Sequence, residues 1–289
     1  MSLRVPTFGT SGILDPTDNA VKNQTFAIVT TWNLPEAYVL ARYLVGRGQR
    51  VGILNSRGRP FTDKLRVVRR LWKNRGSRYI LDRILGGLAY SFYAPAEIVP
   101  FPEIDDRAVG EIRRACECLD SDDIHNSEAL QFVTELAPDY VLVAGAPVIR
   151  PKLYGLARVA TLNRHLGLAP TYRGSNCPIW ALARGDFGNV GATIHLVTEK
   201  VDGGGVVRQA PIPMRRDVSF AEYLAEVQLE GSNLFISVLA EILDGVPLRP
   251  IVQPAGGTHF PPAGLSALRR AYRNYNRERQ RWKASASGS

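Results

Sequence analysis

Short apolar runs alternate with helical repeats from residue 25 onward. The stretch TFAIVTT (25–31) is apolar and β-branched, which is typical of a buried strand. Asn33 is expected to cap a helix, with Glu36 three residues later, and VGIL (51–54) follows as a second strand. The same alternation continues to residue 243, so the sequence predicts an α/β fold with a mainly parallel sheet and helices on both faces.

Most of the other expected elements fit this scaffold. Strands are predicted at 97–101, 115–119, 140–144, 159–163, 191–197 and 206–212, and helices at 107–114, 128–136, 178–184 and 220–243. Residues 60–94 contain two helix-like stretches, which we interpret as an insertion on the scaffold. Residues 1–23 mix Gly, Pro, Asp and Ser without sustained periodicity and are expected to form a flexible leader.

The basic charge of the chain is concentrated in two segments. The 289 residues include 36 Lys and Arg against 27 Asp and Glu, a formal net charge of +9. Residues 57–78 carry a net +8 and residues 269–283 a net +6, so the rest of the chain is mildly acidic. The two segments fit a solvated helix face and a frayed C-terminus, or a nucleic-acid contact, and residues 57–78 also fit a site for a diphosphate or other anionic acceptor. The sequence leaves their role open.

The cysteine content and the N-terminal sequence indicate a compartment. Three cysteines cannot form a closed set of disulfides, and MSLRVPTFGTSG has no apolar core of a secretory signal. Cys116 and Cys118 have no second Cys or His pair at zinc-ligand spacing, so no metal is expected. The longest uncharged run (250–268) contains four prolines and does not suit a membrane span. We therefore expect a cytoplasmic protein.

The candidate chemistry lies between residues 161 and 209. Asn163 and His165 stand two apart at the end of a predicted strand, so both side chains lie on one side of it, and Asp202 follows on a later loop. An amide can donate to the oxygen of a tetrahedral intermediate, an imidazole can relay protons, and a carboxylate can orient that imidazole. The spacing alone leaves a structural interpretation open, since Asp202 before three glycines also fits a turn and His195 also fits a buried core histidine.

Several motifs in this stretch agree in order and spacing with a known family. They are Asn163-Arg164-His165, then Pro170-Thr171-Tyr172-Arg173-Gly174, Gly191-Ala192-Thr193-Ile194-His195, and Val201-Asp202-Gly203-Gly204. Together they resemble the formyltransferases that use 10-formyltetrahydrofolate, over about residues 25–215. The resemblance implies a Rossmann-like sheet and a transferase in which Asn163, His165 and Asp202 are catalytic.

The resemblance also implies two binding regions. Pro147, Val148 and Ile149, in the loop after a predicted strand, would contact the folate together with Glu199 and Lys200. On the acceptor side of the site the resemblance places Tyr172, Arg173 and Gly174. The co-substrate is then 10-formyltetrahydrofolate, and the partner is a small-molecule amine.

Departures from the family narrow the expected acceptor. Glycinamide ribonucleotide transformylase has a Gly/Ser-rich phosphate loop after its first strand, whereas this chain has TTWNLP (30–35) there. Only about 45 residues follow the long helix, too few for the C-terminal barrel of methionyl-tRNA formyltransferase, and the N-terminal regulatory domain of the hydrolases has no counterpart. The chain resembles instead the standalone enzymes that formylate nucleotide-linked amino sugars or similar biosynthetic amines.

These inferences divide the chain as follows: a leader at 1–23, a formyltransferase catalytic domain at 24–215 with a basic helical insertion at 57–94, a C-terminal helical extension at 216–254, and a Pro/Gly-rich segment with a basic tail at 255–289. Two alternatives stay open. The first is a methionyl-tRNA formyltransferase, and the second is a basic protein that binds nucleic acid or a partner on an inactive formyltransferase scaffold. The oligomeric state is also open.

Overall fold

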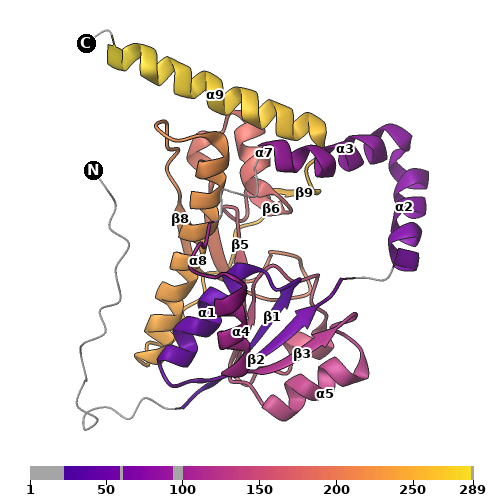
Figure 1. Ribbon diagram of the computed structural model, residues 1–289, viewed down its shortest axis with the longest axis vertical. Helices are drawn as coiled ribbons and strands as arrows, with labels where there is room; N and C mark the ends of the chain where they lie inside the picture. Colours follow the sequence, from indigo (N-terminus) through magenta and orange to yellow (C-terminus); the bar gives the residue numbers. More distant parts are fainter. Residues whose placement is uncertain (1–22, 59–60, 94–99, 288–289) are drawn as a thin grey trace.

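A seven-stranded sheet forms the centre of the molecule in the computed structural model, which describes residues 23–58, 61–93 and 100–287 (Figure 1). Its strands are β1 (Thr25–Thr31), β2 (Arg50–Ser56), β3 (Glu117–Ser121), β4 (Tyr140–Val143), β5 (Ala160–His165), β7 (Gly191–Leu196) and β8 (Val206–Pro211). They lie in the order β3-β2-β1-β4-β5-β7-β8. The first five are parallel, and β7 and β8 are antiparallel, so the predicted mainly parallel sheet is confirmed.

Helices cover both faces of this sheet, as the sequence predicts. The helices near the sheet are α1 (Pro35–Gly46), α4 (Asp106–Arg114), α5 (Ser127–Leu136), α6 (Pro151–Tyr154) and α8 (Phe220–Leu243). Strand β1 shows the two faces, because Phe26 and Ile28 pack with α1, α4 and α8 while Ala27 and Val29 pack with α5 and α6. This alternation is the two-residue period of a strand buried on both sides.

Helix α8 has the bounds expected from the sequence. It begins with a capping box, in which the Ser219 side chain accepts from the backbone N–H of Glu222 and the Glu222 carboxylate accepts from the backbone N–H of Ser219. Phe235 and Leu239 in its second half pack into the core of the sheet. The domain boundary expected at residue 215 stays a prediction. Helix α8 shares a hydrophobic core with the sheet.

A second core lies beside the sheet. It is built from α7 (Cys177–Arg184), α9 (Leu265–Ser287), the first half of α8, and the two-stranded parallel sheet of β6 (Tyr172–Gly174) and β9 (Thr258–Phe260). The 3₁₀ turn Phe187–Asn189 follows α7. The rings of Tyr172 and Phe260 stack here with their centroids 5.1 Å apart.

The basic C-terminal segment is a helix rather than a frayed tail. Ala267, Leu268, Ala271 and Tyr275 recur at helical spacing and are all buried, while the arginines between them face outward. The Tyr275 hydroxyl donates to the carbonyl of Val218 at 3.1 Å, which ties α9 to the start of α8. Helix α9 therefore belongs to the folded body.

The inserted segment forms the two expected helices, α2 (Phe61–Arg75) and α3 (Ser77–Tyr93). In Figure 1 α2 stands at the edge of the molecule away from the sheet, and α3 runs from α2 to the start of α9. Both helices are placed between β2 and α4 in the chain, as an insertion would be. The described helices include none long and apolar enough to cross a membrane.

Two local predictions were wrong or fall partly outside the described residues. Asn33 does not cap α1: it has φ of 52°, the helix is capped at Leu34, and the Asn33 side chain accepts instead from the Tyr38 hydroxyl at 2.6 Å. For the expected strand 97–101, residues 97–99 lie outside the described residues, and Pro100 and Phe101 are not in a strand. Residues 1–22 of the expected leader also lie outside them.

Candidate active site

A cavity of about 590 Å³ opens at the carboxyl ends of the central parallel strands. The chain runs from β1 outward to β2 and β3 and then returns to β4 on the other side of β1, so the strand order reverses between β1 and β4. Ligands bind outside the carboxyl ends of strands at such a reversal. Val143 at the end of β4 and Asn163 near the end of β5 both line the cavity, which is large enough for a drug-sized molecule.

Two of the predicted catalytic side chains come from β5. Asn163 and His165 are two residues apart, so the pleat of the strand places them on the same face, and both line the cavity. Strand β7 runs antiparallel to β5 and pairs Asn163 with His195. The cross-strand register therefore adds a third polar side chain beside the first two.

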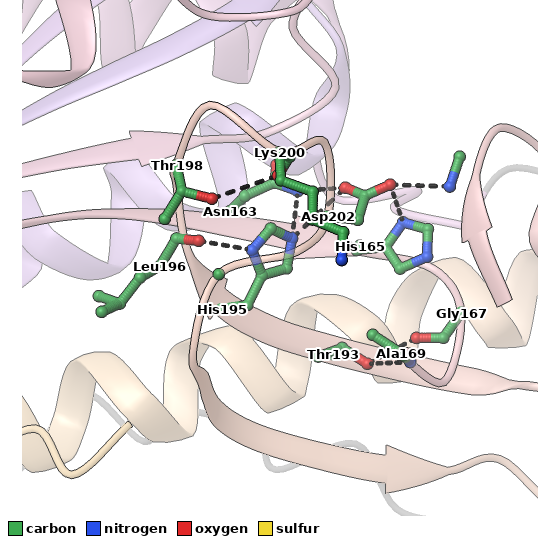
Figure 2. Close-up of polar contacts among 12 residues, drawn as sticks. Asn163, His165, Gly167, Ala169, Thr193, His195, Leu196, Thr198, Lys200 and Asp202 are labelled. Atoms are coloured by element: carbon green, nitrogen blue, oxygen red, sulfur yellow. Dashed lines mark hydrogen bonds and ion pairs between the residues drawn. The ribbon is translucent and has the colours of Figure 1, made fainter. Parts of the chain in front are cut away.

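Asp202 lies between the histidines and the asparagine (Figure 2). One carboxylate oxygen, Oδ2, accepts from the backbone N–H of Gly174 at 2.8 Å and lies 3.5 Å from Nδ1 of His165. The other, Oδ1, lies 3.4 Å from Nε2 of His195 and 3.5 Å from Nδ2 of Asn163. The structure thus brings Asn163, His165 and Asp202 together, as the sequence motifs predict.

The hydrogen bonds of His195 fix its orientation. Its Nδ1 lies 2.8 Å from the carbonyl oxygen of Leu196, so Nδ1 carries a proton and donates it. In the neutral ring Nε2 is then an acceptor, and it takes a hydrogen bond from Nδ2 of Asn163 at 3.0 Å. His195 therefore holds the amide of Asn163 with its nitrogen toward the carboxylate.

His165 has one protonated and one basic nitrogen. Its Nε2 lies 2.8 Å from the carbonyl oxygen of Tyr172 and donates to it, which leaves Nδ1 free to take a proton beside Asp202. Burial lowers the pKa of His165 below its usual 6.5, against the opposing pull of the Asp202 carboxylate. The ring is therefore neutral at pH 7 and able to act as a base.

The loop that carries Asp202 is tightly constrained. Burial alone would raise the pKa of Asp202, but the contacts with His195, His165 and the Gly174 N–H outweigh it and hold the pKa below its usual value. Asp202 itself has φ of 50°, a left-handed conformation that aspartate tolerates and that often occurs at functional sites. Nε2 of Gln253 fixes the loop from outside, donating to the carbonyls of Asp202 at 2.8 Å and Gly204 at 2.7 Å.

Four of the five residues expected near the folate line the cavity: Pro147, Val148, Ile149 and Lys200. Val148 is largely exposed, and its carbonyl lies 3.1 Å from the ring of His125. Glu199 is exposed beside Lys200 but is not among the residues that line the cavity. The folate roles of these five residues stay predictions.

The three residues expected on the acceptor side lie in different environments. Gly174 lines the cavity and donates its N–H to Asp202. The ring of Tyr172 is buried in the second core, where its hydroxyl donates to Asp186 at 2.8 Å, so this residue reaches the site through its carbonyl. Arg173 is also buried, and its guanidinium donates to the carbonyl of Gly256 at 3.2 Å. The side chains of Tyr172 and Arg173 therefore support the fold around the site.

A buried ion pair at the wall of the cavity was not anticipated from the sequence. The Arg164 side chain points to the opposite face of β5 from Asn163 and His165, and its Nη2 lies 2.9 Å from Oε1 of Glu36. Nη1 donates to the backbone carbonyl and the side-chain oxygen of Gln228 at 3.1 and 3.2 Å. All three residues line the cavity, and they join α1, β5 and α8. Their separation in sequence leaves no local pattern that could have shown this contact.

The site offers no activated thiol. Burial raises the pKa of Cys177, the cysteine nearest Asp202, to about 12, so its thiol stays protonated at neutral pH. Over the described part of the chain there is no cluster of three or more His, Cys, Asp or Glu residues suited to a metal ion. The arrangement is that of an amide donor, a neutral imidazole base and an ionised carboxylate around one cavity.

A comparison with protein-family models places the chain in a family. The model described as formyl transferase matches residues 89–239, which is just over half of the chain and includes Asn163, His165 and Asp202. The chain belongs to the formyl transferase family. Relatives of the chain in this family include transferases of a formyl group.

Curated relatives in this family match over a shared region. The chain is 30% identical over 152 residues to a methionyl-tRNA formyltransferase of Limosilactobacillus fermentum, covering 52% of this chain and 48% of that protein. It is 29% identical over 151 residues to a phosphoribosylglycinamide formyltransferase of Escherichia coli, covering 52% and 71%. This formyl transferase chain therefore spans about half the length of the curated methionyl-tRNA formyltransferase that it matches.

Solved structures confirm the Rossmann-like formyl transferase fold. A sugar N-formyltransferase from Shewanella sp FDAARGOS_354 aligns with a TM-score of 0.54 and 14% identity over 87% of each chain. An N-formyltransferase from Helicobacter canadensis, in complex with folinic acid and dTDP-3-aminofucose, aligns with a TM-score of 0.52 and 10% identity over 82% of this chain and 70% of that one. At these identities the likeness establishes the fold.

Proposed function

We propose that this formyl transferase moves a formyl group from 10-formyltetrahydrofolate to the primary amine of a small acceptor, such as a nucleotide-linked amino sugar or a similar biosynthetic amine. One observation carries the proposal. The Asp202 carboxylate lies 3.4 to 3.5 Å from polar nitrogens of Asn163, His165 and His195 at the wall of a cavity of about 590 Å³.

Asn163 supplies the hydrogen bond that stabilises negative charge on the formyl oxygen. One N–H of its amide is held by His195 at 3.0 Å, while its contact with Asp202 at 3.5 Å is long for a hydrogen bond. The second N–H can therefore turn to an oxygen in the cavity as charge develops there. Removal of one such donor typically slows acyl transfer by about 10² to 10³.

His165 takes the proton that the attacking amine releases as it bonds to the formyl carbon, and passes that proton to the donor nitrogen whose bond to this carbon breaks. Its neutral ring presents the basic Nδ1 next to the Asp202 carboxylate, while Nε2–H stays bound to the Tyr172 carbonyl. When Nδ1 is protonated, the imidazolium gains an ion pair with Asp202 inside a buried site. That gain offsets part of the cost of charging a buried ring, because an adjacent carboxylate favours the charged form. General base catalysis of this kind contributes about 10² to 10⁴ in rate.

Asp202 lies beside both histidines, stays ionised throughout and attracts the proton that His165 takes up at Nδ1. Its Gly174 N–H partner and the backbone clamp from Gln253 hold the carboxylate in one position. A preorganised charge of this type costs little reorganisation during the reaction. Asn163, His165 and Asp202 therefore form a set that needs no side-chain nucleophile.

The residues around the cavity fit a folate. Two loops flank the triad: 145–149 after β4, and 197–201 before Asp202. They present Pro147, Val148, Ile149 and Val201 as an apolar wall and a Lys200 ammonium at its edge. A flat heterocycle with an anionic tail suits such a lining, in which apolar contacts dominate and a few polar groups fix orientation. When bound, this co-substrate supplies the activated formyl group.

The relatives of this chain use more than one kind of acceptor. The Helicobacter canadensis N-formyltransferase was solved in complex with dTDP-3-aminofucose, whereas the Limosilactobacillus fermentum relative, which matches over 152 residues, is a methionyl-tRNA formyltransferase. Residues 30–35 replace the Gly/Ser-rich phosphate loop of the ribonucleotide enzymes, which argues against a phosphoribosyl acceptor. We favour a nucleotide-linked amino sugar because the Helicobacter canadensis enzyme of the same fold was solved with one. Methionyl-tRNA is the competing acceptor.

The test is a screen of amines for formyl transfer from 10-formyltetrahydrofolate. Nucleotide-linked amino sugars, hydroxyornithine and initiator methionyl-tRNA are each incubated with the purified chain, and the formylated products are measured by mass spectrometry. We expect formylation of a small amine. Formylation of methionyl-tRNA alone would replace the acceptor, and no transfer to any amine by the folded protein would contradict the proposal.

A further inference from the structure

One side of α3 exposes an apolar stripe. It consists of Leu81, Ile84, Leu85, Leu88 and Phe92, which recur every three or four residues and therefore lie on one face of the helix. All five are exposed, and the two outermost, Leu88 and Phe92, are 74% and 80% exposed. At 1.5 Å per residue the stripe is about 16 Å long. Apolar side chains gathered in this way mark an interaction surface rather than scattered surface residues.

The opposite side of α3 is fixed to the rest of the protein. Asp82 accepts from the backbone N–H of Ser266 at 2.8 Å and from its hydroxyl at 3.1 Å, and α3 contacts α9 along its inner side (Figure 1). Gly86 lies against the backbone of Gly264 and Leu265, where a Cβ would come within 2.6 to 2.9 Å. Tyr90 on this inner side lines the catalytic cavity. These contacts hold the apolar stripe on the outside of the molecule.

Exposed cations occur on the adjoining helix α2 and at the start of α3. They are Arg69, Arg70, Lys73 and Arg75 on α2 and Arg78 on α3. Trp72 on α2 is 59% exposed among them. The carboxylate of Asp82, by contrast, is turned inward to Ser266. We define the α2–α3 face as the apolar stripe, Trp72 and these five cations.

We propose that the α2–α3 face docks on the surface of an anionic lipid bilayer. A helix with aliphatic and aromatic residues beside Lys and Arg suits the boundary between acyl chains and anionic headgroups, with Trp at the headgroup level. The stripe is too short to span the hydrocarbon core, which requires about 20 apolar residues. The helices therefore lie on the bilayer.

Other occupants fit these residues less well. A second copy of the chain packed face to face would bring the same cations against one another, because a two-fold interface is self-complementary. A nucleic acid would pair with the cations but would leave Leu81, Ile84, Leu85 and Leu88 facing phosphates, and aliphatic side chains provide no stacking platform for bases. An anionic bilayer satisfies both the cations and the apolar stripe.

The α2–α3 face lies close to the catalytic cavity. Tyr90 reaches the catalytic cavity from the side of α3 opposite the apolar stripe. A helix with its side chains is about 10 Å thick, so a docked bilayer would lie about that distance from the cavity wall. Docking would therefore hold the cavity beside the membrane surface.

Vesicle co-sedimentation of the full chain tests the proposal. The vesicles contain phosphatidylcholine alone or phosphatidylcholine mixed with phosphatidylglycerol, each at low and at high NaCl. We expect binding to the phosphatidylglycerol vesicles that weakens with salt, since exposed charges are screened. Binding to phosphatidylcholine alone should be much weaker.

Matched variants separate this face from the rest of the surface. Leu88→Gln with Phe92→Gln should weaken binding about tenfold or more. Arg70→Gln should weaken it about fivefold, because each cation near an anionic surface contributes a similar amount. Val159→Gln and Arg114→Gln alter exposed residues far from α2 and α3 and should leave binding unchanged. Circular dichroism of each variant confirms that these exposed changes leave the fold intact.

Three results would overturn the proposal. The first is a wild-type chain that stays in the supernatant with both kinds of vesicle. The second is loss of binding by Val159→Gln equal to that of the α3 variant. The third is self-association, measured by light scattering, that the α3 variant abolishes in the absence of vesicle binding, which would give the face to a second copy.

Discussion

The buried ion pair between Glu36 and Arg164, at the wall of the cavity, predicts a large loss of stability for Glu36→Ala. Glu36 on α1 and Arg164 on β5 are 128 residues apart, and their side chains are only 12% and 4% exposed. Removal of Glu36 leaves the Arg164 guanidinium buried without its charged partner. The remaining contacts of Arg164 are the two Gln228 oxygens at 3.1 and 3.2 Å.

The size of the effect follows from burial. At 2.9 Å the gross attraction between two unit charges is about 6 kcal/mol with an effective dielectric constant of about 20. Truncation of one member of a buried pair typically costs about 3 to 5 kcal/mol, since the other charge stays buried. Because Gln228 still accepts two hydrogen bonds from Arg164, we expect a loss near 3 kcal/mol in the free energy of unfolding.

A surface pair with nearly the same geometry is the control. Arg50 and Glu117 are 2.8 Å apart, but their side chains are 52% and 50% exposed. Glu117→Ala should therefore cost less than about 1 kcal/mol. Both variants are measured by urea unfolding followed by circular dichroism. The reasoning is refuted if Glu36→Ala loses no more stability than Glu117→Ala.

Further predictions concern the base and the loop of Asp202. Because His165 acts as a base only when neutral and its pKa is lowered, the acid limb of kcat/KM should lie below pH 6.5; a limb above that pH would contradict the assignment. Asp202→Asn removes the charge that favours protonated His165, so this limb should move to lower pH in the residual activity. Gly204→Ala would place a Cβ 1.9 Å from the Leu196 carbonyl oxygen, so we expect a loss of about 1 to 3 kcal/mol in the free energy of unfolding and reduced activity. Gly188 has open space around it, so Gly188→Ala should change neither stability nor activity. Equal effects of the two variants in urea unfolding would refute the packing argument.

The sheet could be predicted because its strands are buried on both sides. Runs such as 25–31 and 140–144 are apolar and β-branched, and burial on both faces imposes that composition whatever the neighbouring strands are. The long helix 220–243 has the predicted bounds, and the structure shows a capping box at its start. Asn33 failed as a cap because the fold uses its side chain to bind Tyr38.

The sequence predicted only those site residues that stand in local motifs. Asn163, His165 and Asp202 stand in recognisable motifs, and the structure brings them together. His195 joins them through the antiparallel register of β5 and β7, which a sequence without a fold does not specify.

Long-range contacts account for the rest of what was missed. Glu36 and Arg164 meet only because α1 and β5 pack in one fold. The C-terminal helix was a different case, because a signal was present: Ala267, Ala271 and Tyr275 repeat at helical spacing and are buried. The surrounding arginines favoured the interpretation of this segment as a solvated tail, because a charge-rich segment is most often solvated.

The decisive measurement is single-turnover formyl transfer to the best amine of the screen, with wild type, Asn163→Ala, His165→Ala and the control Asn276→Ala. Asn276 is an asparagine on α9 whose amide donates to a backbone carbonyl of its own helix. The site predicts a fall of about a hundredfold or more for the first two variants, with the fold intact by circular dichroism, and no change for the control. Rates near wild type for both Asn163→Ala and His165→Ala would contradict the assignment of the active site.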